Sequence, residues 1–282
     1  MPELPEVETV RKGLEKLLVD FYITKINVLK ERSIASFGGS KSFINNIENS
    51  YISNWERRGK YLIGSLNTKS KRKKGFLVIH LRMTGQFKLI YKQMLPCKHT
   101  RVRFFEEGGK ELRFIDIRNF GQMWYVPSTK SITEIVSGIR KLGPEPFSNE
   151  FNSRYLKNYL KNKKRSIKSA LLDQSTVAGI GNIYADETLF DAGINPKTKS
   201  RDLNKDDLNR LCNSLLKILK ISIGEGGTTF SDFRDLEGIN GNYGGQALVY
   251  RRTGKSCKIC GEKILREKIC GRSTHWCPNC QK

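Results

Sequence analysis

The chain is organised around its first six residues, Met1-Pro2-Glu3-Leu4-Pro5-Glu6. Pro2 has a side chain small enough for an initiator Met1 to be removed, which would leave a secondary amine at the start of the mature chain. A terminal amine titrates near pH ~8, against about 10.4 for a lysine side chain, so roughly a tenth of it is unprotonated at neutral pH. Such an amine is a nucleophile that needs no burial to be activated.

The same six residues have a chemical and a structural interpretation. A secondary amine that attacks an aldehyde-like carbon yields a cationic iminium, which is an electron sink for elimination chemistry. Glu3 follows this amine directly and is a candidate for moving protons. In the structural interpretation, Pro5 suits the first turn of a helix, and Glu6 and Glu8 suit the positive end of its macrodipole. On these residues alone both interpretations stay open.

A helix and then a series of short strands are expected after this start. Apolar residues recur at helical spacing from Val7 to Leu18 and give the helix one buried stripe. Eight segments rich in β-branched and aromatic residues then follow, with glycine-containing turns between them, which indicates a sandwich or barrel. The expected strands cover residues 21–29, 50–56, 61–66, 76–81, 86–91, 100–105, 112–115 and 122–126.

The second half of the chain has a different pattern. Residues 142–147, Leu-Gly-Pro-Glu-Pro-Phe, stop both helix and strand and place a domain boundary there. Residues 148–224 have helical periodicity, and one helix opens at the turn Gly179-Ile-Gly181. The N–H groups of such a turn can bind phosphate, although a plain tight turn also explains the motif. The glycine-rich residues 224–245 have no periodicity, which is typical of a functional or disordered loop.

Four cysteines near the C-terminus form two Cys-x2-Cys pairs with sixteen residues between the pairs, namely Cys257, Cys260, Cys277 and Cys280. Four thiolates at this spacing predict a closed tetrahedral site for one structural Zn2+. Because protein fills every position, this zinc cannot activate water, and its expected role is to hold a hairpin over residues 261–276. Arg272 is expected near the tip of that hairpin.

The composition points to a polyanionic partner. The 282 residues include 51 lysines and arginines against 28 aspartates and glutamates, a formal net charge of +23. Such an excess is typical of nucleic-acid-binding proteins, with an anionic membrane as the competing partner. The basic run at residues 69–74 is interpreted as a solvated hairpin loop, with a direct DNA contact as the alternative. No apolar run approaches the ~20 residues of a spanning helix and no signal peptide is evident, so we expect a soluble protein of the reducing cytoplasm.

The motifs together resemble those of bacterial formamidopyrimidine-DNA glycosylase, in the same order and over the whole chain. They are residues 1–9 (Met-Pro-Glu-Leu-Pro-Glu-Val-Glu-Thr), Arg58-Gly-Lys-Tyr61, His80-Leu-Arg-Met83, Asp116-Ile-Arg-Asn-Phe-Gly121, Gly179-Ile-Gly-Asn-Ile-Tyr184 and the terminal zinc hairpin. The resemblance implies an α+β protein with DNA in the cleft between its halves. It implies an N-terminal β-sandwich with its terminal helix over residues 1–140, a linker at 141–147, a helix-two-turn-helix domain with a lesion-covering loop at 148–245, and a zinc finger at 246–282.

The resemblance also implies a bifunctional glycosylase and AP lyase of base excision repair, which removes oxidised purines such as 8-oxoguanine and formamidopyrimidines. Pro2 corresponds to the nucleophile that forms a Schiff base, and Glu3 to the proton donor that helps to open the deoxyribose. Lys60 resembles the proton donor for β-elimination, and Arg272 the proton donor for δ-elimination. The implied partner is damaged double-stranded DNA, bound by a monomer in the bacterial cytoplasm and associated with the nucleoid.

A second set of residues matches the DNA contacts of that family. Contacts to DNA or its phosphates are implied for His99, Arg118, Lys164, Lys168 and Asn182. A base inside a duplex must be flipped out before its sugar can be attacked, and the gap must then be filled. The residues implied for that insertion are Met83, Arg118 and Phe120. Taken alone, each lysine or arginine would be a solvated surface charge, and each apolar member would be a core residue.

Two positions depart from the family pattern. Thr84 stands where some members have glutamate, and Ser169 follows Lys168 where proline is usual. These departures leave the chemistry intact but leave the base selectivity open. Residues 226–243 align only loosely with the lesion-covering loop. Two alternative functions remain: an endonuclease VIII-like glycosylase for oxidised pyrimidines, and a non-catalytic DNA-binding protein with a zinc ribbon.

Overall fold

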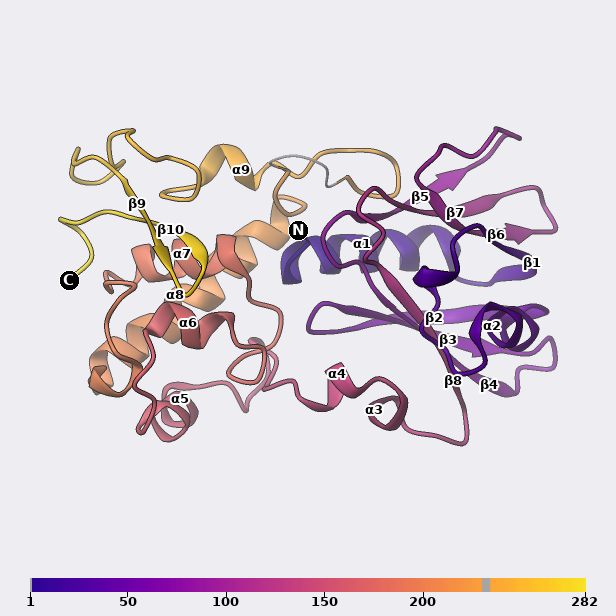
Figure 1. Cartoon of the computed structure of the whole chain (residues 1–282), viewed down its shortest axis with the longest axis horizontal. Helices are drawn as coiled ribbons and strands as arrows, with labels where there is room; N and C mark the ends of the chain where they lie inside the picture. The colour runs from indigo at the N-terminus through magenta and orange to yellow at the C-terminus, as the bar shows by residue number, and fades with distance from the viewer. Residues whose placement is uncertain (1, 230–233) are drawn as a thin grey trace. The chain divides into compact units, whose positions relative to one another are not determined.

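The chain forms two compact units in this computed structural model, which describes residues 2–229 and 234–282 (Figure 1). The N-terminal unit comprises Met1–Arg140 and Gly226–Asn242, and the C-terminal unit comprises Lys141–Glu225 and Tyr243–Lys282. The loop that follows residue 225 therefore belongs to the N-terminal unit, whereas the sequence interpretation assigns it to the helical domain. Part of that loop, residues 230–233, lies outside the described residues.

The N-terminal unit is built on eight antiparallel strands in the order β5-β7-β6-β1-β2-β3-β4-β8. The eight expected strands are confirmed, with ends that differ by a few residues. They are β1 (Phe21–Val28), β2 (Ser50–Arg58), β3 (Tyr61–Asn67), β4 (Lys73–His80), β5 (Gly85–Ile90), β6 (Thr100–Glu106), β7 (Glu111–Asp116) and β8 (Gln122–Pro127). The basic run lies at the β3–β4 hairpin, as expected of a solvated loop.

Helix α1 (Leu4–Leu18) supplies the centre of the apolar core. Its stripe, which includes Val10 and Leu14, is fully or almost fully buried. The same core receives Phe104 and Phe114 from one half of the sheet, and Leu62 from the other. The sheet therefore closes over one core as a β-sandwich, in which each buried large apolar side chain contributes roughly 1.5–3 kcal/mol.

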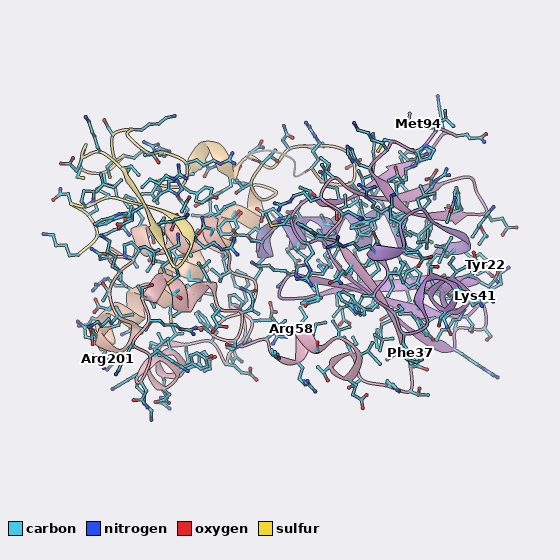
Figure 2. The ribbon with its side chains drawn as sticks, viewed as in Figure 1. Tyr22, Phe37, Lys41, Arg58, Met94 and Arg201 are labelled. Atoms are coloured by element: carbon cyan, nitrogen blue, oxygen red, sulfur yellow. The ribbon has the colours of Figure 1, made fainter. Side chains whose placement is uncertain are left out.

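Several short helices of the N-terminal unit were not expected from the sequence. Helix α2 (Gly39–Ile47) follows Gly38, which has a φ of +79°, and buries only Phe43 and Ile47. The three apolar residues of α2, Phe43, Ile44 and Ile47, span little more than one turn, which is too short to produce a recognisable helical period. The loop before α2 carries Phe37, whose side chain is 95% exposed (Figure 2). The other short helices are η1 (Glu31–Ser33), α3 (Ile132–Ile135) and α4 (Ser137–Arg140).

The C-terminal unit is helical, with a two-stranded hairpin near its end. Its elements are α5 (Ser153–Leu160), α6 (Ile167–Leu172), α7 (Asn182–Asp191), η2 (Ser200–Asp202), α8 (Lys205–Gly224), α9 (Tyr243–Gln246), β9 (Leu265–Ile269) and β10 (Arg272–Trp276). Ser166 caps α6, because its hydroxyl accepts a hydrogen bond from the Ser169 N–H. Asn152 caps α5, because its side-chain oxygen accepts a hydrogen bond from the Tyr155 N–H. No helix among the described residues is long and apolar enough to cross a membrane.

Candidate functional site

The start of the chain is held by the first turn of α1. Pro2 is buried, and Glu3 and Glu6 are 2% and 1% exposed. Glu3 is the N-cap residue, and its N–H donates to Glu6 Oε2 over 2.8 Å. Glu6 lies in the first turn of α1, as the structural interpretation predicted, and its carboxylate also satisfies a backbone donor that the helix cannot use. This bond fixes the backbone directly after Pro2.

The second oxygen of Glu6 ties the loop at Gly226–Asn242 to the same place. Glu6 Oε1 accepts a hydrogen bond of 2.8 Å from the Thr228 N–H. Gly227 has a φ of +81°, and a Cβ there would lie 2.9 Å from Glu6 Oε1, so a glycine is required. Farther along the loop, buried Leu236 packs against Gly13 of α1, where a Cβ would lie 3.2 Å from Leu236 Cδ1. These contacts explain why the loop belongs to the N-terminal unit.

Lys60 lies in the tight turn between β2 and β3 and is 7% exposed. The next residue, Tyr61, pairs with His80 across β3 and β4, and their rings meet edge to face at 4.6 Å. Burial, with smaller contributions from the positive charges of Arg82 and Lys60, lowers the pKa of His80 to about 3. His80 is therefore neutral at physiological pH, and its Nδ1 accepts a hydrogen bond from the Arg82 N–H.

The three residues expected to enter the duplex lie on two neighbouring turns of the N-terminal unit. Met83 is on the β4–β5 turn and is half-buried, whereas Arg118 and Phe120 are on the β7–β8 turn and are exposed. The Arg118 guanidinium lies 5.0 Å from the centre of the Phe120 ring, which is cation–π distance. His99 is close in the fold, because its carbonyl accepts a hydrogen bond from the Asp116 N–H at the end of β7.

Lys168, for which the resemblance implies a phosphate contact, is fully buried in the C-terminal unit. Its Nζ lies 2.7 Å from Asp186 Oδ1 and donates to Thr274 Oγ1 and to the Ser273 carbonyl. All three partners lie inside the protein, so the buried ammonium is not directed at a phosphate outside it. The structure therefore corrects the assignment: Lys168 holds strand β10. The other lysine of this group, Lys164, is exposed before α6 and available to DNA.

Asn182 also contacts the zinc hairpin. It is the first residue of α7, as the Gly-Ile-Gly turn predicted, and its Nδ2 donates to the Ser273 carbonyl over 2.8 Å. One carbonyl next to Arg272 thus accepts from both Lys168 and Asn182. Arg272 itself is exposed, directly after a turn in which Cys270 and Gly271 both have positive φ. Two such residues are typical of a tight type I′ hairpin.

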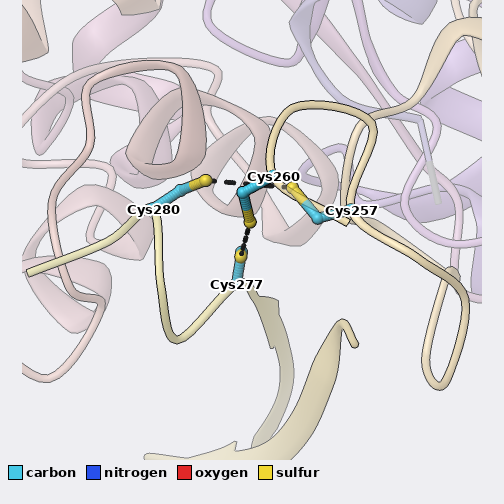
Figure 3. Close-up of side chains that lie close together, drawn as sticks. All are labelled: Cys257, Cys260, Cys277 and Cys280. Atoms are coloured by element: carbon cyan, nitrogen blue, oxygen red, sulfur yellow. Dashed lines mark hydrogen bonds between the residues drawn. The ribbon is translucent and has the colours of Figure 1, made fainter. Parts of the chain in front are cut away.

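The four cysteines of the Cys-x2-Cys pairs converge on one point (Figure 3). Their sulphur atoms all lie within 4.8 Å of one another, with 3.9 Å between Cys257 and Cys280 and 3.5 Å between Cys260 and Cys277. Tetrahedral zinc with Zn–S bonds of about 2.3 Å needs sulphurs about 3.8 Å apart, so this set fits one structural zinc ion. Gln281 supports the site, since its Oε1 accepts from the Cys277 N–H and its Nε2 donates to Ile194.

Two adjacent carboxylates on α7 were missed by the sequence analysis. Asp186 and Glu187 are both fully buried. Besides pairing with Lys168, Asp186 accepts from the backbone N–H and Nδ1 of His275 in β10. Glu187 accepts from three consecutive N–H groups, those of residues 248–250, while burial raises its pKa. In the sequence, the signal for these residues is an Asp-Glu pair among the apolar residues of a helix. That pattern does not show which groups the two carboxylates bind.

Comparisons with known proteins cover nearly the whole chain. The formamidopyrimidine-DNA glycosylase N-terminal domain matches residues 1–123, and the H2TH domain of formamidopyrimidine-DNA glycosylase matches residues 142–234. A zinc finger found in FPG and IleRS matches residues 254–282. A formamidopyrimidine-DNA glycosylase of Prochlorococcus marinus (strain NATL1A) is 82% identical over 282 residues, which is 100% of both chains.

Solved structures of similar proteins contain damaged DNA. One is the Lactococcus lactis FPG mutant G226P with Fapy-dG-containing DNA, with a TM-score of 0.91, 33% identity and 100% of both chains covered. Another is MutM with DNA that contains carbocyclic 8-oxo-G, with a TM-score of 0.90, 33% identity and the same coverage.

Proposed function

The chain belongs to the formamidopyrimidine-DNA glycosylase family, and from this membership we infer the residues with which it removes oxidised purines from damaged DNA in base excision repair. AP lyase activity is typical of this family. The observation that carries the proposal is the start of the chain, where buried Pro2 and Glu3 are anchored by the Glu6 carboxylate.

Pro2 acts as the nucleophile once Met1 has been removed. Its nitrogen lone pair forms a bond to C1′ of the damaged nucleotide while the bond from C1′ to the base breaks. The base leaves with that electron pair and takes up the proton that the nitrogen loses. Glu3 transfers a proton to the ring oxygen, so the deoxyribose opens and a cationic iminium forms. Support for these roles comes from the burial of Glu3 and from the fixed backbone between the two residues.

Strand cleavage follows by elimination at the two phosphates. Lys60, buried beside a neutral His80, is assigned the proton transfer of β-elimination. A guanidinium is a very weak acid, with a pKa above about 12, so Arg272 is a poor proton donor for δ-elimination. The exposed guanidinium at the hairpin turn instead suits a bidentate clamp on the phosphate beside the lesion.

Met83, Arg118 and Phe120 fill the gap that the flipped nucleotide leaves. Two apolar side chains can separate the base step, and a guanidinium can bond the base left without a partner. Their position on neighbouring turns supports this assignment. Direct contacts with DNA are further proposed for His99, Lys164 and Asn182, and the enzyme is proposed to act as a monomer on nucleoid DNA in the cytoplasm. The alternative of a non-catalytic zinc-ribbon DNA-binding protein does not explain why residues 1–123 match the glycosylase N-terminal domain.

The nucleophile is tested by reduction of the covalent intermediate. Borohydride should trap the mature protein on a duplex with 8-oxoguanine opposite cytosine, because it reduces the iminium to a stable amine. An added residue before Pro2 should abolish trapping, whereas Pro2→Gly keeps a terminal amine and should retain part of it. Trapping that persists with a blocked N-terminus would show that another amine reacts, and Lys60 would be examined next.

A further inference from the structure

The turns that carry Met83, Arg118 and Phe120 share one buried carboxylate, that of Asp116, which is fully buried at the end of β7. Its Oδ2 accepts hydrogen bonds from the N–H groups of Phe120, at 2.8 Å, and Gly121, at 2.7 Å. Its Oδ1 accepts from the Arg118 N–H at 3.2 Å. One side chain thus binds three of the amides that shape the β7–β8 turn.

Thr84 connects the other turn to the same carboxylate. It directly follows Met83, and its hydroxyl donates to Asp116 Oδ1 over 2.5 Å while accepting from the Arg118 N–H at 3.0 Å. The Thr84 side chain is 8% exposed and both roles of its hydroxyl are in use. This explains the departure noted in the sequence: the residue after Met83 serves as an internal bridge between the two turns.

The backbone around this bridge is closely packed. A Cβ on Gly85 would lie 2.8 Å from the buried Phe114 ring, and a Cβ on Gly121 would lie 2.4 Å from it. The backbones of both turns therefore pack directly against the same aromatic side chain. Arg82 and Asn119 have φ values of 55° and 56°, a backbone conformation that residues other than glycine rarely adopt. Both turns are therefore held in fixed and unusual conformations in the protein without DNA.

We propose that Thr84 and Asp116 are positioning residues, which hold Met83, Arg118 and Phe120 in one preformed unit before DNA is bound. This inference rests on the proposed function of those three side chains as the group that enters the duplex. A preformed group does not lose conformational freedom on insertion, so more of the binding free energy remains for flipping the damaged nucleotide. Neither positioning residue needs to touch DNA.

The test uses Thr84→Val, because removal of Asp116 would leave the Phe120 and Gly121 amides and the Thr84 hydroxyl without their acceptor and could unfold the unit. In the protein without DNA, hydrogen exchange at the amides of residues 118–121 should become at least tenfold faster. Single-turnover excision of 8-oxoguanine from a duplex should become about tenfold slower, equivalent to about 1.4 kcal/mol. Thr84→Ser keeps the hydroxyl and should remain within twofold of the natural protein in both measurements.

Two controls separate positioning from a general loss of structure. β-Elimination on a single-stranded abasic oligonucleotide needs no inserted group, so Thr84→Val should leave its rate unchanged. Thr24→Val removes a comparable hydroxyl bond, to the Phe105 carbonyl, elsewhere in the same unit and should change neither exchange at 118–121 nor excision.

Unchanged exchange in Thr84→Val would overturn the bridge between the turns. Faster exchange with normal excision would show that the bridge exists but does not position groups used in catalysis. Equal losses of rate by Thr84→Val on the duplex and on the single-stranded substrate would overturn the inference by showing a merely structural role. If the proposed function itself were wrong, the natural protein would also fail to excise 8-oxoguanine.

Discussion

Lys168 shows at the residue scale how burial changes what a charged side chain can do. The family resemblance implied a phosphate contact, yet Lys168 is fully enclosed with Asp186 and two oxygens of β10. The other oxygen of Asp186, Oδ2, accepts hydrogen bonds from the backbone N–H and Nδ1 of His275 on the same strand. These groups therefore hold strand β10 in place.

Lys168→Met should lower the free energy of unfolding by about 3–5 kcal/mol, because it leaves the buried Asp186 carboxylate without its cation. Lys164→Met is the matched control: this exposed lysine should change stability by less than about 0.5 kcal/mol and weaken DNA binding. Urea unfolding and DNA titration of both variants check the prediction. A Lys168→Met protein of normal stability with weakened DNA binding would instead support a direct phosphate contact.

His80 gives the N-terminal unit a dependence on pH. Its pKa is about 3 in the folded protein and near 6.5 when unfolded, so between these values only the unfolded chain binds the proton. The free energy of unfolding therefore falls as the pH falls from about 6.5 towards 3. From pH 7 to pH 5 the loss due to His80 should be about 2 kcal/mol.

Urea unfolding at pH 7 and pH 5 checks this dependence. The loss between the two values should be about 2 kcal/mol smaller for His80→Gln than for the natural protein, since glutamine is neutral throughout. His99→Gln, a change at a half-buried histidine of the same unit, serves as the comparison. Equal losses for His80→Gln and the natural protein would mean that the folded protein protonates His80 in this range.

At the scale of elements, the β9–β10 hairpin depends on contacts outside itself. An isolated two-stranded hairpin is at best marginally stable in water. This one is held at one end by the four cysteines and along β10 by Lys168, Asn182 and Asp186. Zinc and α7 together therefore position the turn that carries Arg272.

Cys277→Ser should remove the zinc, raise hydrogen exchange across residues 265–276 and weaken DNA binding at least tenfold, or about 1.4 kcal/mol. The β-sandwich should keep its stability. Cys270→Ser changes an exposed thiol at the hairpin turn that is not among the four ligands, and it should keep one zinc per chain. Zinc analysis after dialysis, with exchange and binding measurements, provides the check. Normal binding by metal-free protein would exclude the hairpin from DNA recognition.

At the scale of the whole molecule, the net charge of +23 should dominate binding to DNA. A protein that contacts about six to ten phosphates loses roughly 10³–10⁵ in affinity between 50 and 200 mM salt, because bound counterions are released. We expect this range for undamaged duplex. Lys164→Gln should make the plot of log affinity against log salt concentration shallower by about one.

The matched control is Lys41→Gln, on α2, where no DNA contact is proposed. It should leave the slope unchanged. Titrations at four salt concentrations are sufficient for the comparison. An unchanged slope in Lys164→Gln would remove that residue from the set of phosphate contacts.

Local patterns in the sequence were sufficient for the features that depend on neighbouring residues. The stripe of α1, the eight strands and the two Cys-x2-Cys pairs each have a short period or spacing, which is preserved wherever the segment lies. For the same reason the α7 start at Asn182 was predicted correctly. Helix α2 has too few apolar residues for a period and was missed.

Only the tertiary structure decided which polar groups are buried together. Lys164 and Lys168 look alike in sequence, yet Lys164 is exposed, whereas Lys168 is buried and donates hydrogen bonds to residues more than a hundred positions away. Asp116 was part of a recognised motif, but its bonds to two turns become evident only when Thr84 lies beside it. The loop after residue 225 belongs to the N-terminal unit because Thr228 donates a hydrogen bond to Glu6 and Leu236 packs against Gly13. Burial and pairing of this kind arise from contacts between distant segments, which no local pattern records.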